Sequence, residues 1–297
     1  MRVGITGASG LIGKALSAHL RTNGHEVTPF VRRVPEVGEI RWDPSGKGLD
    51  RGDLVGIDAV VHLAGAGIGD KRWTDAYREE ILASRVTGTT RIAEAIASTQ
   101  GGPKILLSGS AIGIYGDRHD QVLDEQSGRG TGFLSDVCTA WEAATAPAEQ
   151  AEARVVHLRT GIVLSPAGGA LKKMLPLFKL GIGGRFGNGK QWQSWISLTD
   201  EVRAIEHLLT SSLSGPVNLT APNPVTNREF SKALGRALHR PSLVPVPGFG
   251  PKLLLGSDMA DSLLFESQRV LPAALLNDGF TFEHADVGDA FTAILSQ

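Results

Sequence analysis

Short apolar runs alternate with stretches of helical periodicity along the first half of the chain. The apolar runs are typical of buried parallel strands, and they predict strands at residues 2–6, 26–31, 40–42, 58–65, 104–110 and 153–161. Apolar residues recur at helical spacing between them, which predicts helices at residues 11–24, 71–98 and 133–150. This alternation predicts an α/β fold, namely a Rossmann-type doubly wound parallel sheet.

The pattern changes after Gly161. Residues 176–196 are rich in glycine and aromatic residues and predict loops and short strands. A helix is predicted at 199–209 with Thr199 as its N-cap, and Thr226 with Glu229 forms a capping box that opens another helix. We therefore expect a dinucleotide-binding domain over 1–165, with 192–220 returning to it. Residues 166–191 and 221–297 are expected to form a smaller C-terminal α/β substrate lobe.

Three glycines follow the first predicted strand and open the first predicted helix. Gly7, Gly10 and Gly13 have the spacing G-x-x-G-x-x-G. Glycine lets the backbone approach a pyrophosphate closely, and the N–H groups at the start of a helix attract the anion. A plain tight turn is the alternative, but the strand and helix on either side favour a dinucleotide site.

The end of the second predicted strand indicates which dinucleotide is bound. An acidic residue there would favour NAD, because it would accept hydrogen bonds from the ribose 2′-hydroxyl. The chain has Arg32 and Arg33 instead. Guanidinium groups match a 2′-phosphate in charge and geometry, so NADP is predicted over NAD. Two solvated loop arginines are the alternative.

Composition and charge narrow the class of protein. The 297 residues include 30 Lys and Arg against 31 Asp and Glu, a balance that argues against nucleic acid or an acidic membrane as partner. Residues 252–265 are interrupted by Gly256, Asp258 and Asp261, so no membrane span is expected. The start of the chain lacks the apolar region of a signal peptide. With a single cysteine, we expect a cytoplasmic protein.

Several longer motifs resemble those of the extended short-chain dehydrogenase/reductases, the superfamily of the NAD-dependent epimerases and dehydratases. HLAGAG and SGSAIGIYG follow the fourth and fifth main strands. The chain looks most like an atypical branch usually labelled epimerase family proteins. The segments that carry this closer likeness are EEILASR, SDVCTAWE, LRTGIVLS, GNGKQWQSWI and SLLFESQRVLPAALLNDGF. The last resembles the small C-terminal domain of unknown function typical of that branch.

The resemblance implies a set of cofactor contacts. It places the pyrophosphate on Gly7, Ser9, Gly10, Leu11 and Ile12, the 2′-phosphate on Arg32, the adenosine beside Leu63 and Ala64, and further contacts at Glu80 and Arg85. Arg85 could instead pair with Glu80 and stiffen its helix, although five residues is not the favourable spacing. The superfamily also forms homodimers through its long helices, which makes a homodimer possible here.

One part of the superfamily pattern is missing. Members carry a Tyr and, four residues later, a Lys on one helix, and this pair moves a proton as hydride is transferred. With Glu142 as the anchor, these positions hold Leu134 and Cys138. Neither can perform the task. We expect this helix to pack against the core through Phe133, Val137, Cys138 and Trp141, with a nucleophilic Cys138 as the minor alternative.

Other polar residues are candidates for catalysis and for substrate binding. By the resemblance, Ser110 matches the superfamily's hydroxyl residue that hydrogen-bonds the substrate. Tyr115 is the best candidate for a relocated proton donor, and the alternative is that it only lines the wall of the site. Gln191, Ser194 and Trp195 are expected to contact substrate near the cleft between the lobes. Lys190, Arg185 and Arg159 could bind an anion or be solvated. The histidines have no metal-ligand spacing, so no metal site is expected.

Two functions fit these residues. The first is an NADP-dependent oxidoreductase or nucleotide-sugar-epimerase-like enzyme that acts on a small polar substrate through a modified proton relay. The second is a protein that holds NADP(H) without turnover, such as a sensor of redox state. The missing Tyr/Lys pair favours the second, and a complete second lobe with polar residues favours the first.

Overall fold

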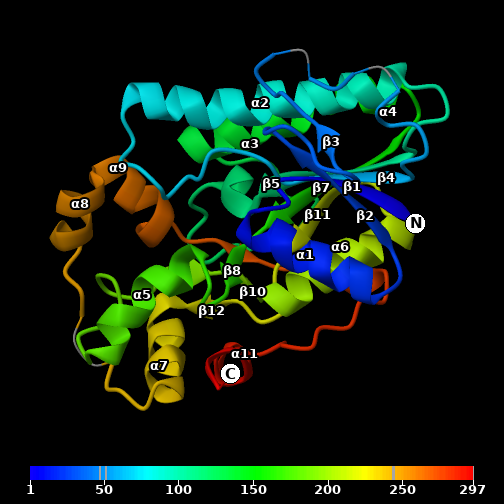
Figure 1. The fold of residues 1–297 in the computed structure, drawn as a ribbon. Coiled ribbons are helices and arrows are strands. Elements are labelled where there is room, and N and C mark those ends of the chain that lie inside the picture. Colours follow the sequence, from blue (N-terminus) through cyan, green and yellow to red (C-terminus); the bar gives the residue numbers. More distant parts are fainter. Residues whose placement is uncertain (47, 51, 243–244, 297) are drawn as a thin grey trace. The chain divides into compact units, whose positions relative to one another are not determined.

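A seven-stranded parallel sheet forms the centre of the fold (Figure 1). The computed structural model describes residues 1–46, 48–50, 52–242 and 245–296. From one edge to the other, the strands are β11 (Gly215–Leu219), β7 (Arg154–Thr160), β5 (Ile105–Ala111), β4 (Ala59–His62), β1 (Arg2–Thr6), β2 (Glu26–Val31) and β3 (Ile40–Arg41). The chain builds outward from β1 to β3 and then returns to β4, so the strand order reverses between β1 and β4. This reversal is the switch point at which doubly wound sheets bind ligands.

Both faces of the sheet are covered because its central strands are apolar on both sides. Every residue of β4 is buried, and Val3 and Ile5 of β1 are fully buried. In Figure 1 the long helix α2 runs along one face and α1 and α6 along the other. The helices of this layer are α1 (Leu11–Thr22), α2 (Asp75–Ser98), α3 (Phe133–Ala143), α4 (Ala146–Gln150) and α6 (Leu198–Thr210). The predicted doubly wound α/β sheet is confirmed.

The chain divides into two compact units, each made of three segments. Unit 1 comprises Met1–Ala111, Val137–Arg159 and Val202–Val217. Unit 2 comprises Ile112–Asp136, Thr160–Glu201 and Asn218–Gln297. The domain boundaries expected from the sequence stay a prediction.

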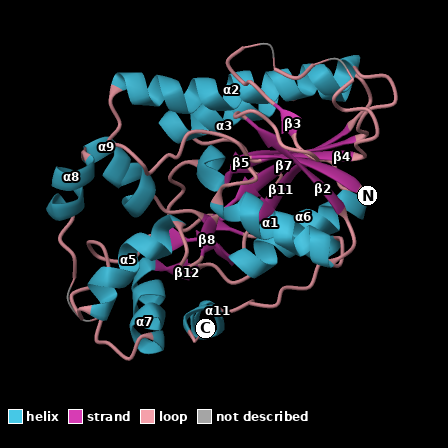
Figure 2. Ribbon diagram, in the orientation of Figure 1, coloured by secondary structure: helices cyan, strands magenta, loops and turns pink. Residues whose placement is uncertain are grey.

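Unit 2 contains short strands and helices (Figure 2), and it has a hydrophobic core of its own. Its strand pairs are β8 (Ile162–Leu164) with β10 (Trp195–Ser197), β9 (Trp192–Gln193) with β12 (Val225–Thr226), and β6 (Val122–Leu123) with β13 (Arg269–Val270). Its helices are η1 (Ile112–Tyr115), α5 (Gly169–Lys179), α7 (Asn227–Ala237), α8 (Phe249–Leu255), α9 (Ser257–Ala260), η2 (Asp261–Phe265), α10 (Ala273–Asn277) and α11 (Val287–Leu295). Trp195, Phe230, Leu234 and Phe291 are buried together in the core.

Three local predictions need correction. The helix expected at 133–150 is broken after Ala143, because Pro147 has no N–H to donate and the Thr145 hydroxyl bonds to the Glu142 carbonyl at 2.7 Å. Residues 176–179, expected to be loop, belong to α5. The N-cap of α6 is Ser197 rather than Thr199, because its hydroxyl accepts from the Asp200 N–H at 3.0 Å. The capping box of Thr226 and Glu229 is confirmed.

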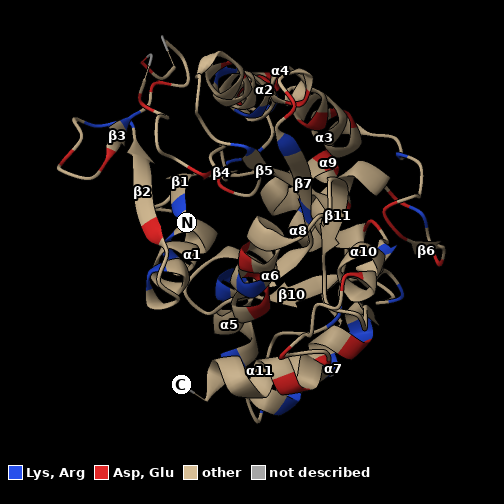
Figure 3. Cartoon of the chain, turned by 90° about the vertical axis from the view of Figure 1, so that its right-hand side faces the viewer, with Lys and Arg blue, Asp and Glu red and all other residues tan. Residues whose placement is uncertain are grey.

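The surface charges match the balanced composition. Figure 3 shows both signs on the same elements, for example on α6 and α7. No helix among the described residues is both long enough and apolar enough to cross a bilayer.

Candidate functional site

The glycine loop at the end of β1 has the geometry that close approach of an anion requires. Gly7 has φ +67°, which favours glycine, and a side chain at Gly13 would overlap the Gly7 carbonyl. Gly10 is the N-cap of α1, so no side chain caps this helix, and its first turn has no acidic residue. The N–H groups at the start of α1 are therefore left for a negatively charged group. This loop fits a pyrophosphate.

Thr6 ties the glycine loop to the end of β4. Its hydroxyl oxygen accepts from the backbone N–H groups of Leu63 and Ala64 at 3.1 and 3.2 Å. The hydroxyl proton is then directed to Nδ1 of His62, 2.7 Å away. Burial lowers the pKa of His62 to about 4, so the ring is neutral and can accept this proton. Leu63, Ala64 and Gly7 are thus brought together at the switch point, as cofactor binding there would require.

The loop after β4 is also held by α2. The Arg85 guanidinium donates to the Ala66 carbonyl at 2.9 Å and lies over the Trp141 ring at 4.9 Å. Glu80 pairs with Lys71 at 3.6 Å, so the alternative in which Glu80 pairs with Arg85 is not observed. Arg85 is a half-buried cation beside the loop that carries Leu63 and Ala64.

The two arginines after β2 differ in their partners. Arg33 forms ion pairs with Glu39 at 2.7 Å and Glu36 at 3.4 Å. Arg32 is exposed, and its side chain has no ion pair or hydrogen bond among the described residues. Arg32 is therefore the better placed of the two to receive a phosphate.

The helix α3, which would carry the Tyr/Lys pair in other family members, packs against the core at these positions. Val137, Cys138 and Trp141 are buried, as the sequence predicts, whereas Phe133 is only half-buried. Burial, together with the negative charge of Glu142, raises the pKa of Cys138 to about 12. The thiol is therefore protonated at neutral pH and is a poor nucleophile.

A buried charged cluster lies at the ends of β5 and β7. Glu142 accepts a hydrogen bond from the Ser110 hydroxyl at 2.7 Å and two from Arg159 at 2.8 and 2.9 Å. Burial would raise the pKa of Glu142, but the hydrogen bonds and charge of Arg159 outweigh it and hold the pKa below its ordinary value. Glu142 is therefore ionised, and the Ser110 proton points to it.

His157 borders this cluster. Its Nε2 lies 3.0 Å from the Thr145 hydroxyl, and its Nδ1 lies 3.8 Å from the Glu142 carboxylate. Burial lowers the pKa of His157, against the opposing pull of Glu142 and Glu149. The ring is thus predominantly neutral at pH 7.

Tyr115 lies in unit 2, whereas Ser110 lies in unit 1. The Tyr115 side chain is fully buried, and its hydroxyl donates to Asn218 at 2.8 Å. Asn218 in turn donates to the Leu271 carbonyl at 3.0 Å. This geometry favours the wall position for Tyr115 over proton donation.

The three residues expected to contact substrate lie in different surroundings within unit 2. Gln191 lines a pocket. Ser194 is fully buried. Its hydroxyl donates to the Gln268 carbonyl and accepts from the Val270 N–H, each at 2.8 Å. Trp195 is fully buried in the core and donates to the Asn223 carbonyl at 3.2 Å.

The sequence does not predict that Ser110, Glu142 and Arg159 bond to one another. The sequence identifies Glu142 only as the position from which the missing pair is counted, and it leaves Arg159 as either an anion ligand or a solvated side chain. Ser110, Glu142 and Arg159 are far apart in sequence, so no short spacing connects them. The one available signal was that both Ser110 and Arg159 end apolar strands, which places them at the same edge of a parallel sheet. Among the described residues, no group of His, Cys, Asp and Glu is arranged to hold a metal ion.

An uncapped glycine-rich helix start at the switch point of a doubly wound sheet is typical of Rossmann-type dinucleotide-binding folds. The chain belongs to the NAD dependent epimerase/dehydratase family, whose model matches residues 3–219. A domain of unknown function, DUF1731, matches residues 246–294. The resemblance noted in the sequence is confirmed by both matches.

Individual relatives extend over the whole chain. The epimerase family protein Mb2239 of Mycobacterium bovis is 47% identical over 97% of this chain and 95% of its own. The crystal structure of human epimerase family protein SDR39U1 with NADPH is 34% identical, covers 100% of this chain and 99% of its own, and has a TM-score of 0.92. MoeE5 in complex with UDP-glucuronic acid and NAD is 25% identical, covers 99% and 98%, and has a TM-score of 0.78.

Proposed function

We propose that the chain binds NADP(H) at the start of α1, with Arg32 on the 2′-phosphate. The observation that carries this proposal is the contrast between Arg32, which has no partner among the described residues, and Arg33, which is paired with Glu36 and Glu39. No acidic residue directly follows β2 to prefer a 2′-hydroxyl. The human relative crystallised with NADPH supports the same choice, and NAD is the less favoured cofactor.

The other proposed contacts follow the path of the cofactor across the switch point. Gly7, Ser9, Gly10, Leu11 and Ile12 would hold the pyrophosphate, and Leu63 and Ala64 would lie beside the adenosine. Arg85 is proposed as a further contact because it is a cation fixed by Ala66 and Trp141 beside that loop. Glu80 is proposed as a contact from the family resemblance, and in this structure its carboxylate pairs with Lys71.

We propose that the chain acts as an NADP-dependent oxidoreductase or epimerase-like enzyme on a small polar substrate. The nicotinamide would supply the hydride chemistry. The Ser110 hydroxyl donates its hydrogen bond to Glu142. The Ser110 oxygen can therefore accept a hydrogen bond from a substrate hydroxyl. Arg159 keeps Glu142 ionised and therefore keeps Ser110 in this orientation. Ser110 is thus the favoured catalytic candidate, and Tyr115 the second.

The alternative function is an NADP(H)-binding protein without turnover. It is favoured by the same helix, in which Leu134 and the protonated thiol of Cys138 occupy the positions of the usual pair. A chain that binds the nucleotide but neither oxidises NADPH with a panel of aldehydes, ketones and sugar carbonyls nor reduces NADP⁺ with the matching alcohols would support this alternative.

Paired titrations test the cofactor proposal. Purified protein is titrated with NADPH and with NADH while nicotinamide fluorescence is followed. We expect NADPH to bind at least about tenfold tighter. Arg32→Glu should erase that preference, because it puts a carboxylate where the 2′-phosphate would lie.

Arg33→Glu is the matched control. It changes the charge by the same amount on the neighbouring residue, but Arg33 already neutralises Glu36 and Glu39. We expect it to keep most of the preference for NADPH. Equal losses from the two variants would show that only the general charge matters, and failure of both nucleotides to bind would contradict the proposal.

A further inference from the structure

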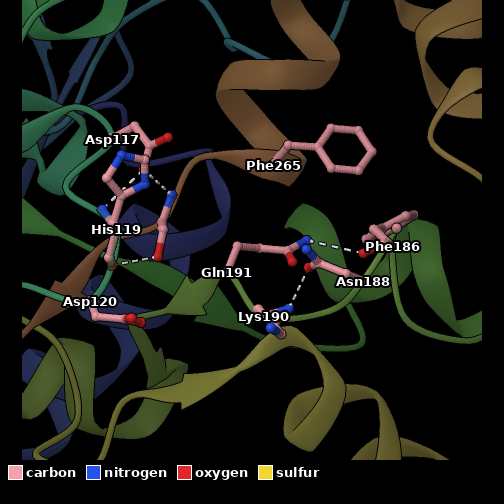
Figure 4. A pocket seen from close by; sticks show the side chains of 10 residues that line it. Asp117, His119, Asp120, Phe186, Asn188, Lys190, Gln191 and Phe265 are labelled. Atoms are coloured by element: carbon pink, nitrogen blue, oxygen red, sulfur yellow. Dashed lines mark hydrogen bonds and ion pairs between the residues drawn. The ribbon is translucent and has the colours of Figure 1, made fainter.

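Unit 2 contains a pocket of about 470 Å³ that the proposed cofactor contacts do not use. Its walls come from three segments, residues 117–120, 186–191 and 265–267. Figure 4 shows Asp117, His119 and Asp120 on one side, with Phe186, Asn188 and Phe265 on the other. The volume lies in the range of small-molecule sites, about 300–1,000 Å³.

Buried hydrogen bonds hold the three segments together. Gln191 is 8% exposed, and its side-chain amide donates to the carbonyls of Leu264 at 2.9 Å and Phe186 at 3.4 Å. Ser267 donates its N–H to Asp117 at 3.1 Å and its hydroxyl to the His119 carbonyl at 2.7 Å. The pocket is therefore formed before any ligand enters.

Gln191 also presents an acceptor to the pocket. Both of its amide hydrogens have protein partners, whereas its side-chain oxygen has no hydrogen bond among the described residues. A side chain that is more than nine-tenths buried and keeps an unused acceptor at a pocket wall points to a ligand that donates a hydrogen bond there.

One side of the pocket is acidic. Asp117 uses Oδ1 to accept from the N–H groups of Ser267 and His119, and Asp120 uses Oδ1 to accept from the Trp192 ring at 2.9 Å. The second oxygen of each carboxylate has no partner among the described residues. Burial, reinforced by the negative charges of Asp117 and Asp261, raises the pKa of the nearby Glu266 to about 7. This side therefore favours a positively charged group.

The other walls are basic and apolar. Lys190 is exposed and has no carboxylate partner within the described parts of the chain. The Asn188 side-chain oxygen accepts from the Lys190 N–H at 2.8 Å, which leaves the Asn188 amide hydrogens free to donate. The Phe186 and Phe265 rings pack edge to face at 6.2 Å and form an apolar surface.

We propose that this pocket binds a small zwitterion with an apolar body. Its ammonium group would bind the free oxygens of Asp117 and Asp120 and the Gln191 oxygen. Its carboxylate would bind Lys190 and Asn188, and its apolar part would lie against Phe186 and Phe265. The pocket disfavours a diphosphate, because its two aspartates outnumber its single lysine. The negative charges of the aspartates and of the diphosphate would repel each other strongly at a partly buried site.

Three matched probes test the proposal: L-phenylalanine, 2-phenylethylamine and 3-phenylpropionate. The second lacks the carboxylate and the third lacks the amine. Binding to the full chain is followed by saturation-transfer NMR at millimolar concentrations, with and without NADPH. We expect L-phenylalanine to bind about tenfold tighter than either partial probe, because only it uses both charged sides.

Two variants locate the binding. Asp117→Asn keeps the acceptor for Ser267 and His119 but removes the charge, so it should weaken only the two amine-bearing probes. Lys190→Met should weaken only the two carboxylate-bearing probes. Asp289→Asn and Lys232→Met, at exposed positions on α11 and α7, are the matched controls and should change neither.

Three outcomes would overturn the proposal: no saturation transfer to any probe, equal binding of L-phenylalanine and a partial probe, or binding of L-phenylalanine that neither variant weakens. None of these three outcomes depends on nucleotide binding. The pocket proposal can therefore fail while the cofactor proposal holds, and the cofactor proposal can fail while the pocket proposal holds.

Discussion

Glu142 accepts hydrogen bonds from Ser110 and Arg159 while it is largely buried. In the usual family arrangement, a Tyr hydroxyl with a nearby Lys can either give or take a proton. Here the Ser110 proton is committed to a carboxylate, so Ser110 can accept but not donate while Glu142 stays ionised. At this residue the site is suited to recognising an alcohol rather than to protonating a carbonyl oxygen.

Glu201 is another buried carboxyl, and no Lys, Arg or His of the described residues forms an ion pair with it. It is fully buried in α6, accepts from the Thr160 hydroxyl at 2.9 Å, and its Oε2 has no hydrogen bond within the described residues. Burial raises the pKa of Glu201 to about 8. The folded protein therefore keeps this proton at neutral pH, whereas the unfolded chain releases it.

This difference predicts a pH dependence of stability. Because the folded state holds the extra proton, the free energy of unfolding falls as pH rises from about 4.5 to about 8. The decrease is up to about 1.4 kcal/mol per pH unit. Glu201→Gln has no proton to lose, so its stability relative to the original protein should rise over the same window. Urea unfolding at pH 5, 6, 7 and 8 measures the difference. Parallel curves for the two proteins would show that Glu201 is ionised in the folded state.

Local patterns account for most elements of the sheet layer. β1 and β2 begin and end where the sequence predicts, since their apolar runs are bounded by polar or glycine residues. Pro29 lies inside β2 even though it cannot donate a hydrogen bond, and it pairs in register with Ile5. Here the packing of apolar side chains outweighs one missing donor.

The junction of β1 and α1 depends on Gly13 more than on any other position of the loop. A Cβ there would overlap the Gly7 carbonyl and force strand and helix apart. We expect Gly13→Ala to lower the free energy of unfolding and to abolish NADPH binding, measured by urea unfolding and by nicotinamide fluorescence.

Gly288→Ala is the control for Gly13→Ala. Gly288 lies in α11, and a Cβ there would meet nothing within 4 Å. It should leave nucleotide binding unchanged and stabilise the helix by about 0.5–1 kcal/mol. If Gly13→Ala behaved like Gly288→Ala, the close packing at the loop would not matter for binding.

At the scale of the molecule, the sequence could predict the fold class and the cofactor loop but not the charged cluster or the pocket. The loop is one continuous stretch, so its spacing is visible. The pocket is assembled from segments around Asp120, Gln191 and Phe265, which are separated by more than 70 residues in each step. Only tertiary contacts bring such segments together, and no periodicity records them.

The C-terminal segment matched by DUF1731 is part of the core of unit 2. Val270, Leu275 and Phe291 are fully buried, and β13 pairs with β6. Each large apolar side chain contributes about 1.5–3 kcal/mol, and a whole domain is stable by only about 5–15 kcal/mol. A chain that ends after Ser242 should therefore fail to accumulate in soluble form.

Phe291→Ala is the milder comparison for this truncation. It should cost about 3–5 kcal/mol and lower the melting temperature while the chain remains folded. Soluble expression and circular dichroism measure both outcomes. A truncated chain that folded and melted cooperatively would show that the last 55 residues (297 − 242) are an accessory to unit 2 rather than part of its core.

The interleaving of the two units has a consequence for biosynthesis. Unit 1 is completed only by Val202–Val217, and the whole of the first two segments of unit 2 is synthesised before that piece. The edge strand β11 of the sheet is therefore synthesised late, and the unfinished sheet exposes β7 as a bare edge in the meantime. We therefore expect the nascent chain to need protection until β11 has emerged, and its yield to depend on translation speed and chaperone supply.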